Sequence, residues 1–73
     1  MKTQHIDEKL LNEYISNSGL RIDYICTQLG LSTTAFHNKR KGKTPFRVSE
    51  IYVLCDLLHI NNDDKTKIFY AES

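Results

Sequence analysis

The chain lacks the features that mark secreted and membrane proteins. It has only two cysteines among 73 residues, whereas a small secreted domain held by disulfides normally has more. No apolar run approaches the ~18 residues that a membrane span needs, and the first ten residues contain no apolar segment of the signal-peptide type. We therefore expect one small cytoplasmic domain, with Cys26 and Cys55 as reduced core residues.

Motifs for catalysis and metal binding are also missing. The three histidines and two cysteines show no metal-ligand spacing. No glycine-rich phosphate loop follows a strand, because the pattern predicts no strand. Asp63 and Asp64 suit the positive end of a helix dipole and require no catalytic role. We expect no enzymatic activity, no metal site and no cofactor.

Acidic residues are absent from the middle of the chain. There is none between Asp23 and Glu50, while five basic residues give that segment a charge of +5. The remainder carries −4, so the net charge of +1 hides a strong asymmetry. A charge run is often only a solvated face, but this one lies on and just after a single predicted helix. That placement favours nucleic acid as a partner.

Apolar spacing predicts an all-α fold of five helices in a single domain over residues 1–73, with its core at about 7–60. Pro45 predicts a loop before the fourth helix, with Phe46 as its anchor in the core. Asn62 is the expected cap of the last helix. The predicted helices cover about 7–17, 22–29, 33–41, 48–58 and 62–70.

The connection between the second and third predicted helices is very short. Gly30 suits the left-handed conformation that ends a helix, and Ser32 can cap the helix that follows. Two helices joined by so few residues cross steeply, which is the helix-turn-helix arrangement. Only Ala35 and Phe36 are apolar in the third helix, so most of its surface is left for a partner.

The order of elements from about Leu10 to Ile60 resembles the lambda-repressor/Cro type of helix-turn-helix protein. The brevity of the chain is similar to that of small Cro-like regulators and modulators of repression from temperate phages. Two positions depart from the family pattern: Ile22 replaces a common phosphate-binding glutamine, and Lys39 replaces a common apolar residue. The resemblance is carried by Ile25, Cys26, Leu29, Gly30, Leu31, Ser32, Phe36, Gly42 and the helix from Ile51 to Leu58.

The resemblance implies a sequence-specific DNA-binding regulator of a phage or mobile-element switch, acting in the bacterial cytoplasm with its third helix in the major groove. Ser32 has a competing role as helix cap. The residues expected at base edges are Thr33, Thr34, His37 and Asn38. Those expected at phosphates are Arg21, Ser32, Lys39, Arg40, Lys41, Lys43 and Arg47.

The alternative is a protein-interaction module that binds the phage repressor and modulates its operator binding. Exposed aromatic residues would support it, and Tyr24 lies off the apolar stripe of its helix. Tyr52 and Phe69, in contrast, are expected in the core. Ile68, Phe69 and Tyr70 are consecutive, and helical geometry cannot turn all three toward one core. At least one should stay on the surface, and we expect these three residues to bind the repressor or to form a weak homodimer.

Overall fold

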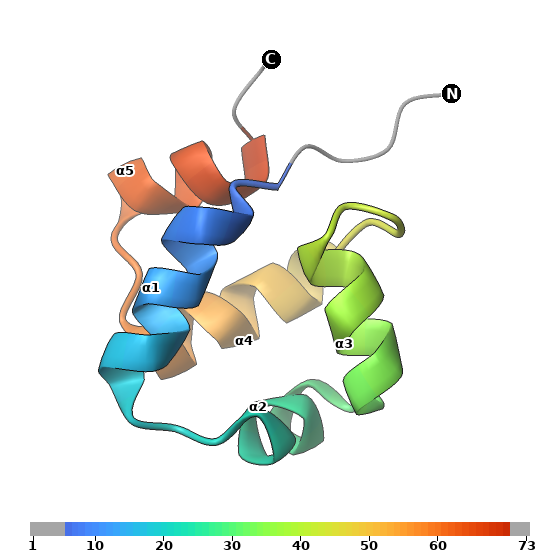
Figure 1. Ribbon diagram of the computed structural model, residues 1–73. Helices are drawn as coiled ribbons and strands as arrows, with labels where there is room; N and C mark the ends of the chain where they lie inside the picture. The colour runs from blue at the N-terminus through green and yellow to red at the C-terminus, as the bar shows by residue number, and fades with distance from the viewer. Residues whose placement is uncertain (1–5, 71–73) are drawn as a thin grey trace.

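Every regular element of the computed structural model, which describes residues 6–70, is helical (Figure 1). In that range it contains five α-helices and no strand, as the periodicity predicts. The domain prediction of 1–73 extends beyond it at both ends, into residues 1–5 and 71–73, which lie outside the described residues. The elements are α1 (Glu8–Ser18), α2 (Ile22–Leu29), α3 (Thr33–Arg40), α4 (Val48–Leu58), α5 (Asn62–Lys65) and the π-helical segment η1 (Thr66–Tyr70).

Local capping chemistry sets the helix boundaries. Asp7 begins α1, where its side chain accepts a hydrogen bond from the Leu10 N–H at 3.1 Å. Gly19 and Gly30 end α1 and α2 with φ of 73° and 71°, the left-handed region that a side chain disfavours. The prediction for Gly30 is therefore confirmed.

The cap of α5 differs from the prediction by one residue. Asn61, not Asn62, has the extended backbone of an N-cap, with φ −75° and ψ 169°. Its side-chain oxygen accepts a hydrogen bond from the Asp64 N–H at 2.7 Å. Asn62 is already the first helical residue, so the prediction of Asn62 as the cap is wrong.

A single apolar core joins all the helices except α5. Phe36 and Phe46 meet edge to face with ring centroids 6.2 Å apart, and Phe46 meets Phe69 in the same way at 5.4 Å. The loop before α4 is thereby anchored in the core, as expected for Phe46. The buried apolar residues are Leu11, Ile15, Ile25, Cys26, Phe36, Phe46, Ile51, Leu54, Leu58, Ile60, Ile68 and Phe69.

The last segment of the described chain, η1, packs against α1 and places two neighbouring side chains in the core. Ile68 and Phe69 are only 0% and 2% exposed, which confirms the expected place of Phe69 in the core and leaves neither side chain at the surface for a partner. Two consecutive side chains can share one core, as Ile25 and Cys26 also do in α2. Tyr70 is 49% exposed, which confirms that at least one of the three stays on the surface.

Tyr52, which is expected in the core, lies on the surface instead. Its side chain comes directly after the buried Ile51 in the sequence, but it lies off the buried side of α4 and is 62% exposed. The Lys65 ammonium lies 5.3 Å from the centre of its ring. Tyr24 is 47% exposed, as its position off the stripe of α2 predicts.

A side-chain hydrogen bond fastens α5 to α1. The Tyr14 hydroxyl donates to the Asp64 carboxylate, and this bond, together with burial, raises the pKa of Tyr14. Both cysteines are free thiols whose pKa values burial raises, Cys26 inside the core and Cys55 at its edge. No helix within residues 6–70 is long and apolar enough to cross a membrane.

Candidate nucleic-acid interface

The first two turns of α3 expose polar side chains of several kinds. The Ser32 side chain caps the helix by accepting a hydrogen bond from the Ala35 N–H at 3.1 Å. Thr33, Thr34 and His37 are exposed and Asn38 is half-buried. Hydroxyl, imidazole and carboxamide groups can each donate and accept hydrogen bonds, as contacts to base edges require.

Three of the predicted phosphate-binding cations are exposed near helix ends. Arg21 is the N-cap residue of α2, and Arg47 is that of α4. Lys43 follows α3, and its backbone N–H donates to the Asn38 carbonyl at 3.0 Å. These residues carry the positive charge that is most accessible to a partner.

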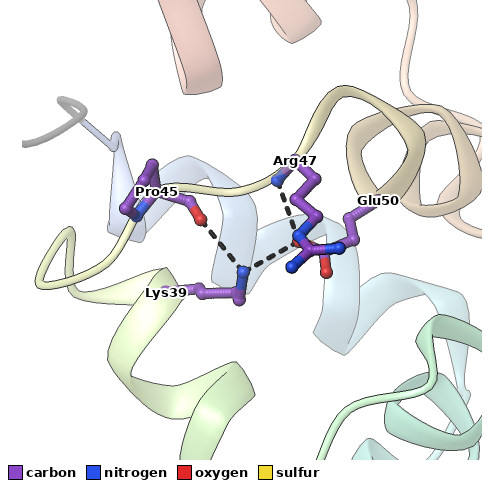
Figure 2. A network of polar contacts seen from close by, with 4 residues as sticks. All are labelled: Lys39, Pro45, Arg47 and Glu50. Carbon is purple, nitrogen blue, oxygen red and sulfur yellow. Dashed lines mark hydrogen bonds and ion pairs between the residues drawn. The ribbon is translucent and has the colours of Figure 1, made fainter.

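Lys39 points into the protein instead (Figure 2). Its ammonium lies 3.0 Å from a Glu50 carboxylate oxygen and donates to the Pro45 carbonyl, also at 3.0 Å. The two side chains are only 12% and 10% exposed. The prediction of Lys39 as a phosphate ligand is therefore wrong, because the ammonium already has internal partners that a phosphate would have to displace.

Glu50 is the acceptor on which this network centres. Its carboxylate also accepts a hydrogen bond from the Arg47 N–H at 2.9 Å, so it fixes the start of α4 (Figure 2). Burial acts to raise the pKa of this carboxyl. The Arg47 N–H and the Lys39 ammonium outweigh that effect and hold the pKa below its usual value, so the group is ionised at neutral pH.

Arg40 is directed toward α1. Its guanidinium carbon lies 5.0 Å from the centre of the Phe36 ring, and one terminal nitrogen donates to the Asn12 side-chain oxygen at 2.8 Å. The Arg40 Nε is buried without a hydrogen-bond partner. Its charge is therefore less accessible to a phosphate than the charges of Lys43 and Arg47.

The Lys41 side chain is only weakly paired and stays exposed. Its ammonium lies 3.9 Å from a Glu8 carboxylate oxygen, and both side chains are about 40% exposed. Pairs of this kind contribute little and exchange readily with other partners. The +5 segment is thus partly neutralised from outside, by Glu50 at Lys39 and weakly by Glu8 at Lys41.

Glu8, Asn12 and Glu50 are the residues that sequence reasoning missed. All three lie outside the basic segment but hold its side chains in place. Glu8 and Asn12 are four residues apart, a spacing that puts them on one face of a helix. Glu50 stands three residues after the N-cap Arg47, which is the spacing of a capping box.

Polar residues of α3, the cations that follow it and Arg21 at the start of α2 form the candidate interface. It consists of Thr33, Thr34, His37, Asn38, Arg21, Lys41, Lys43 and Arg47. Among residues 6–70 no three His, Cys, Asp or Glu side chains are grouped so that they could hold a metal ion. Comparison with known proteins does not extend this description: no family model matches the chain, and neither a curated protein nor a solved structure shows significant similarity to it.

Proposed function

We propose that the protein is a small sequence-specific DNA-binding transcriptional regulator in which α2 and α3 form a helix-turn-helix and α3 enters the major groove. The observation that carries the proposal is the one-sided burial of α3. Phe36 is its only fully buried residue, while Thr33, Thr34 and His37 are exposed. A helix held by one large anchor presents the rest of its surface to a partner.

The dimensions and charge of α3 suit this partner. A helix with its side chains is about 10–12 Å across, and the major groove is about 12 Å wide, so α3 can enter it. The helix contains no acidic residue, so nothing on it repels phosphate. Arg21, Lys43 and Arg47 can contact the backbone on either side and orient the helix without reading sequence.

The resemblance of the sequence to lambda-repressor/Cro proteins supports the same proposal and adds a setting. A chain of 73 residues with this order of helices is similar to small regulators of phage and mobile-element switches. In that setting the protein would act on an operator close to its own coding region. Two copies on half-sites about one DNA turn apart would give the usual gain in affinity.

Selection from a random duplex library, followed by fluorescence anisotropy, tests the proposal. We expect one enriched sequence, bound about 10³-fold or more tightly than a shuffled duplex of equal length. Unrelated selected sequences, or equal affinity for selected and shuffled duplexes, would contradict sequence-specific binding.

The exposed tyrosines favour a second candidate, the repressor-binding module. Tyr24, Tyr52 and Tyr70 are each about half exposed or more, and tyrosine is enriched at protein interfaces. A gel shift on the DNA that flanks the coding region, with and without the neighbouring repressor, separates the two candidates. Binding by the protein alone favours the regulator, whereas an effect seen only with repressor favours the module.

A further inference from the structure

The segment from Lys41 to Arg47 is fixed to the two helices that it connects. The Lys43 N–H donates to the carbonyl of Asn38 at the end of α3, and the Phe46 ring is buried in the core. Between these two points, the Lys39 ammonium holds the Pro45 carbonyl at 3.0 Å.

The same ammonium connects this loop to α4. Lys39 and Glu50 approach from opposite helices, with 3.0 Å between nitrogen and oxygen (Figure 2). Glu50 in turn holds the Arg47 N–H at 2.9 Å. One ion pair, shielded from water on most sides, therefore fixes the end of α3, the loop and the start of α4.

Two exposed cations that follow the C-cap of α3 lie on this fixed segment. Lys43 and Arg47 flank Pro45, so the direction of their side chains depends on the course of the backbone that Lys39 and Glu50 hold. A loop with no such anchor would have to be ordered when DNA binds, at a cost in conformational entropy.

We propose that Lys39 and Glu50 form an internal clamp that positions Lys43 and Arg47 beside α3 for binding to DNA phosphates. Lys39 is then a positioning residue, and Glu50, an acid, assists binding to a polyanion. This inference rests on the proposed DNA-binding function, but the clamp itself can be measured without DNA.

The direction in which Glu50→Gln changes DNA affinity distinguishes a positioning role of Glu50 from a purely electrostatic one. If only charge mattered, Glu50→Gln would remove a repulsive carboxylate and tighten binding. If the clamp positions the loop, the same change weakens binding. Loss of one phosphate contact removes about 0.9 from the slope of log affinity against log salt, which corresponds to about eightfold weaker binding at 0.1 M salt.

Glu8→Gln is the matched control. Like Glu50, Glu8 is an acidic residue paired with a lysine near the end of α3. Its partner is Lys41, and this pair is long and exposed. We expect Glu8→Gln to bind DNA as tightly as the wild type or more tightly, and Glu50→Gln to bind about eightfold more weakly with a shallower salt slope. All measurements are made at a temperature at which melting curves show every variant folded. Equal or tighter binding by Glu50→Gln would overturn the proposal.

Amide hydrogen exchange in the free protein tests the clamp independently of DNA. In Lys39→Met we expect the Lys43 and Arg47 amides to exchange faster relative to the core amide of Leu54. A uniform increase at all three would show a purely global loss of stability and would overturn the clamp. If the wild type bound no DNA, the proposed function would fail, and exchange would still decide whether the clamp holds the loop.

Discussion

Phe36 is the one fully buried side chain through which α3 packs on the core. Its side chain is fully buried, packs edge to face with Phe46 and lies under the Arg40 guanidinium. We expect Phe36→Ala to lower the free energy of unfolding by about 3–5 kcal/mol, because a large cavity opens where no other apolar residue of α3 is fully buried. Denaturant unfolding measures the loss. Thr33→Ala, at an exposed position, should stay within about 0.5 kcal/mol of the wild type, and a loss there equal to that of Phe36→Ala would contradict the one-sided packing.

Glu50 should make the stability of the protein depend on acid pH. Its pKa is lowered in the folded protein, because the Arg47 N–H and the Lys39 ammonium outweigh burial. The unfolded chain has a pKa of about 4.3 at this group. The stabilisation is therefore complete above that pH and is lost as the pH falls through the lower folded value.

Glu50→Gln should accordingly destabilise the protein by about 3 kcal/mol at pH ~7, since one partner of a largely buried pair is removed. The difference from the wild type should narrow at pH ~3, below the pKa of this carboxyl in the unfolded chain, because proton binding there favours the unfolded state. Thermal melting at the two pH values measures both effects. A difference that is the same at both would show that the charge of Glu50 does not stabilise the fold.

At the scale of the element, substitutions on α3 and just after it should distinguish residues that contact bases from residues that contact phosphates. Asn38 lies on the helix and Lys43 just beyond it. We expect Asn38→Ala to cost about 1–3 kcal/mol at the selected site and much less on shuffled DNA. Lys43→Ala should weaken binding to both duplexes alike and reduce the salt slope by about 0.9. Anisotropy titrations on both duplexes measure these effects. If Asn38→Ala lowered the affinity for both duplexes equally, Asn38 would contact no base.

The elements themselves could be predicted from the sequence because their boundaries depend on local chemistry. Gly30 ends α2 and Ser32 begins α3 through contacts within a few residues. The π-helical conformation of η1 has no such local signal, since nothing in the order of Ile68 and Phe69 distinguishes a π-helix from an α-helix. The cap of α5 depended on a choice between two adjacent asparagines, Asn61 and Asn62, and backbone conformation decided it.

The candidate site could be predicted only in part, because the partners of its cations lie far along the chain. The exposure of Thr34 follows from its place nearly opposite Phe36, since residues two apart on a helix point to different sides. The burial of Lys39 does not, since it depends on how α3 and α4 are oriented when Glu50, eleven residues away, meets it. Pattern analysis counts charges on a segment, whereas the fold determines which of them remain available.

On the scale of the whole molecule, the distribution of free charge limits how strongly the protein can bind DNA. Lys39 is paired internally and Arg40 is held against α1. Arg21, Lys43 and Arg47 remain exposed, and Lys41 is held only by a long, exposed pair with Glu8. Three or four phosphate contacts give a monomer weak affinity at physiological salt, so two copies on one operator, or a partner protein, would be needed for tight binding.

The salt dependence of duplex DNA binding tests the central claim most directly. Anisotropy titrations of the wild type between about 50 and 200 mM salt should give a slope of log affinity against log salt of roughly −2.7 to −3.6 per protein, as three or four phosphate contacts require. The titrations would use the selected duplex and its shuffled counterpart, and both should show the salt effect. A slope near zero on both duplexes would contradict DNA binding by this protein and favour a protein partner for α3.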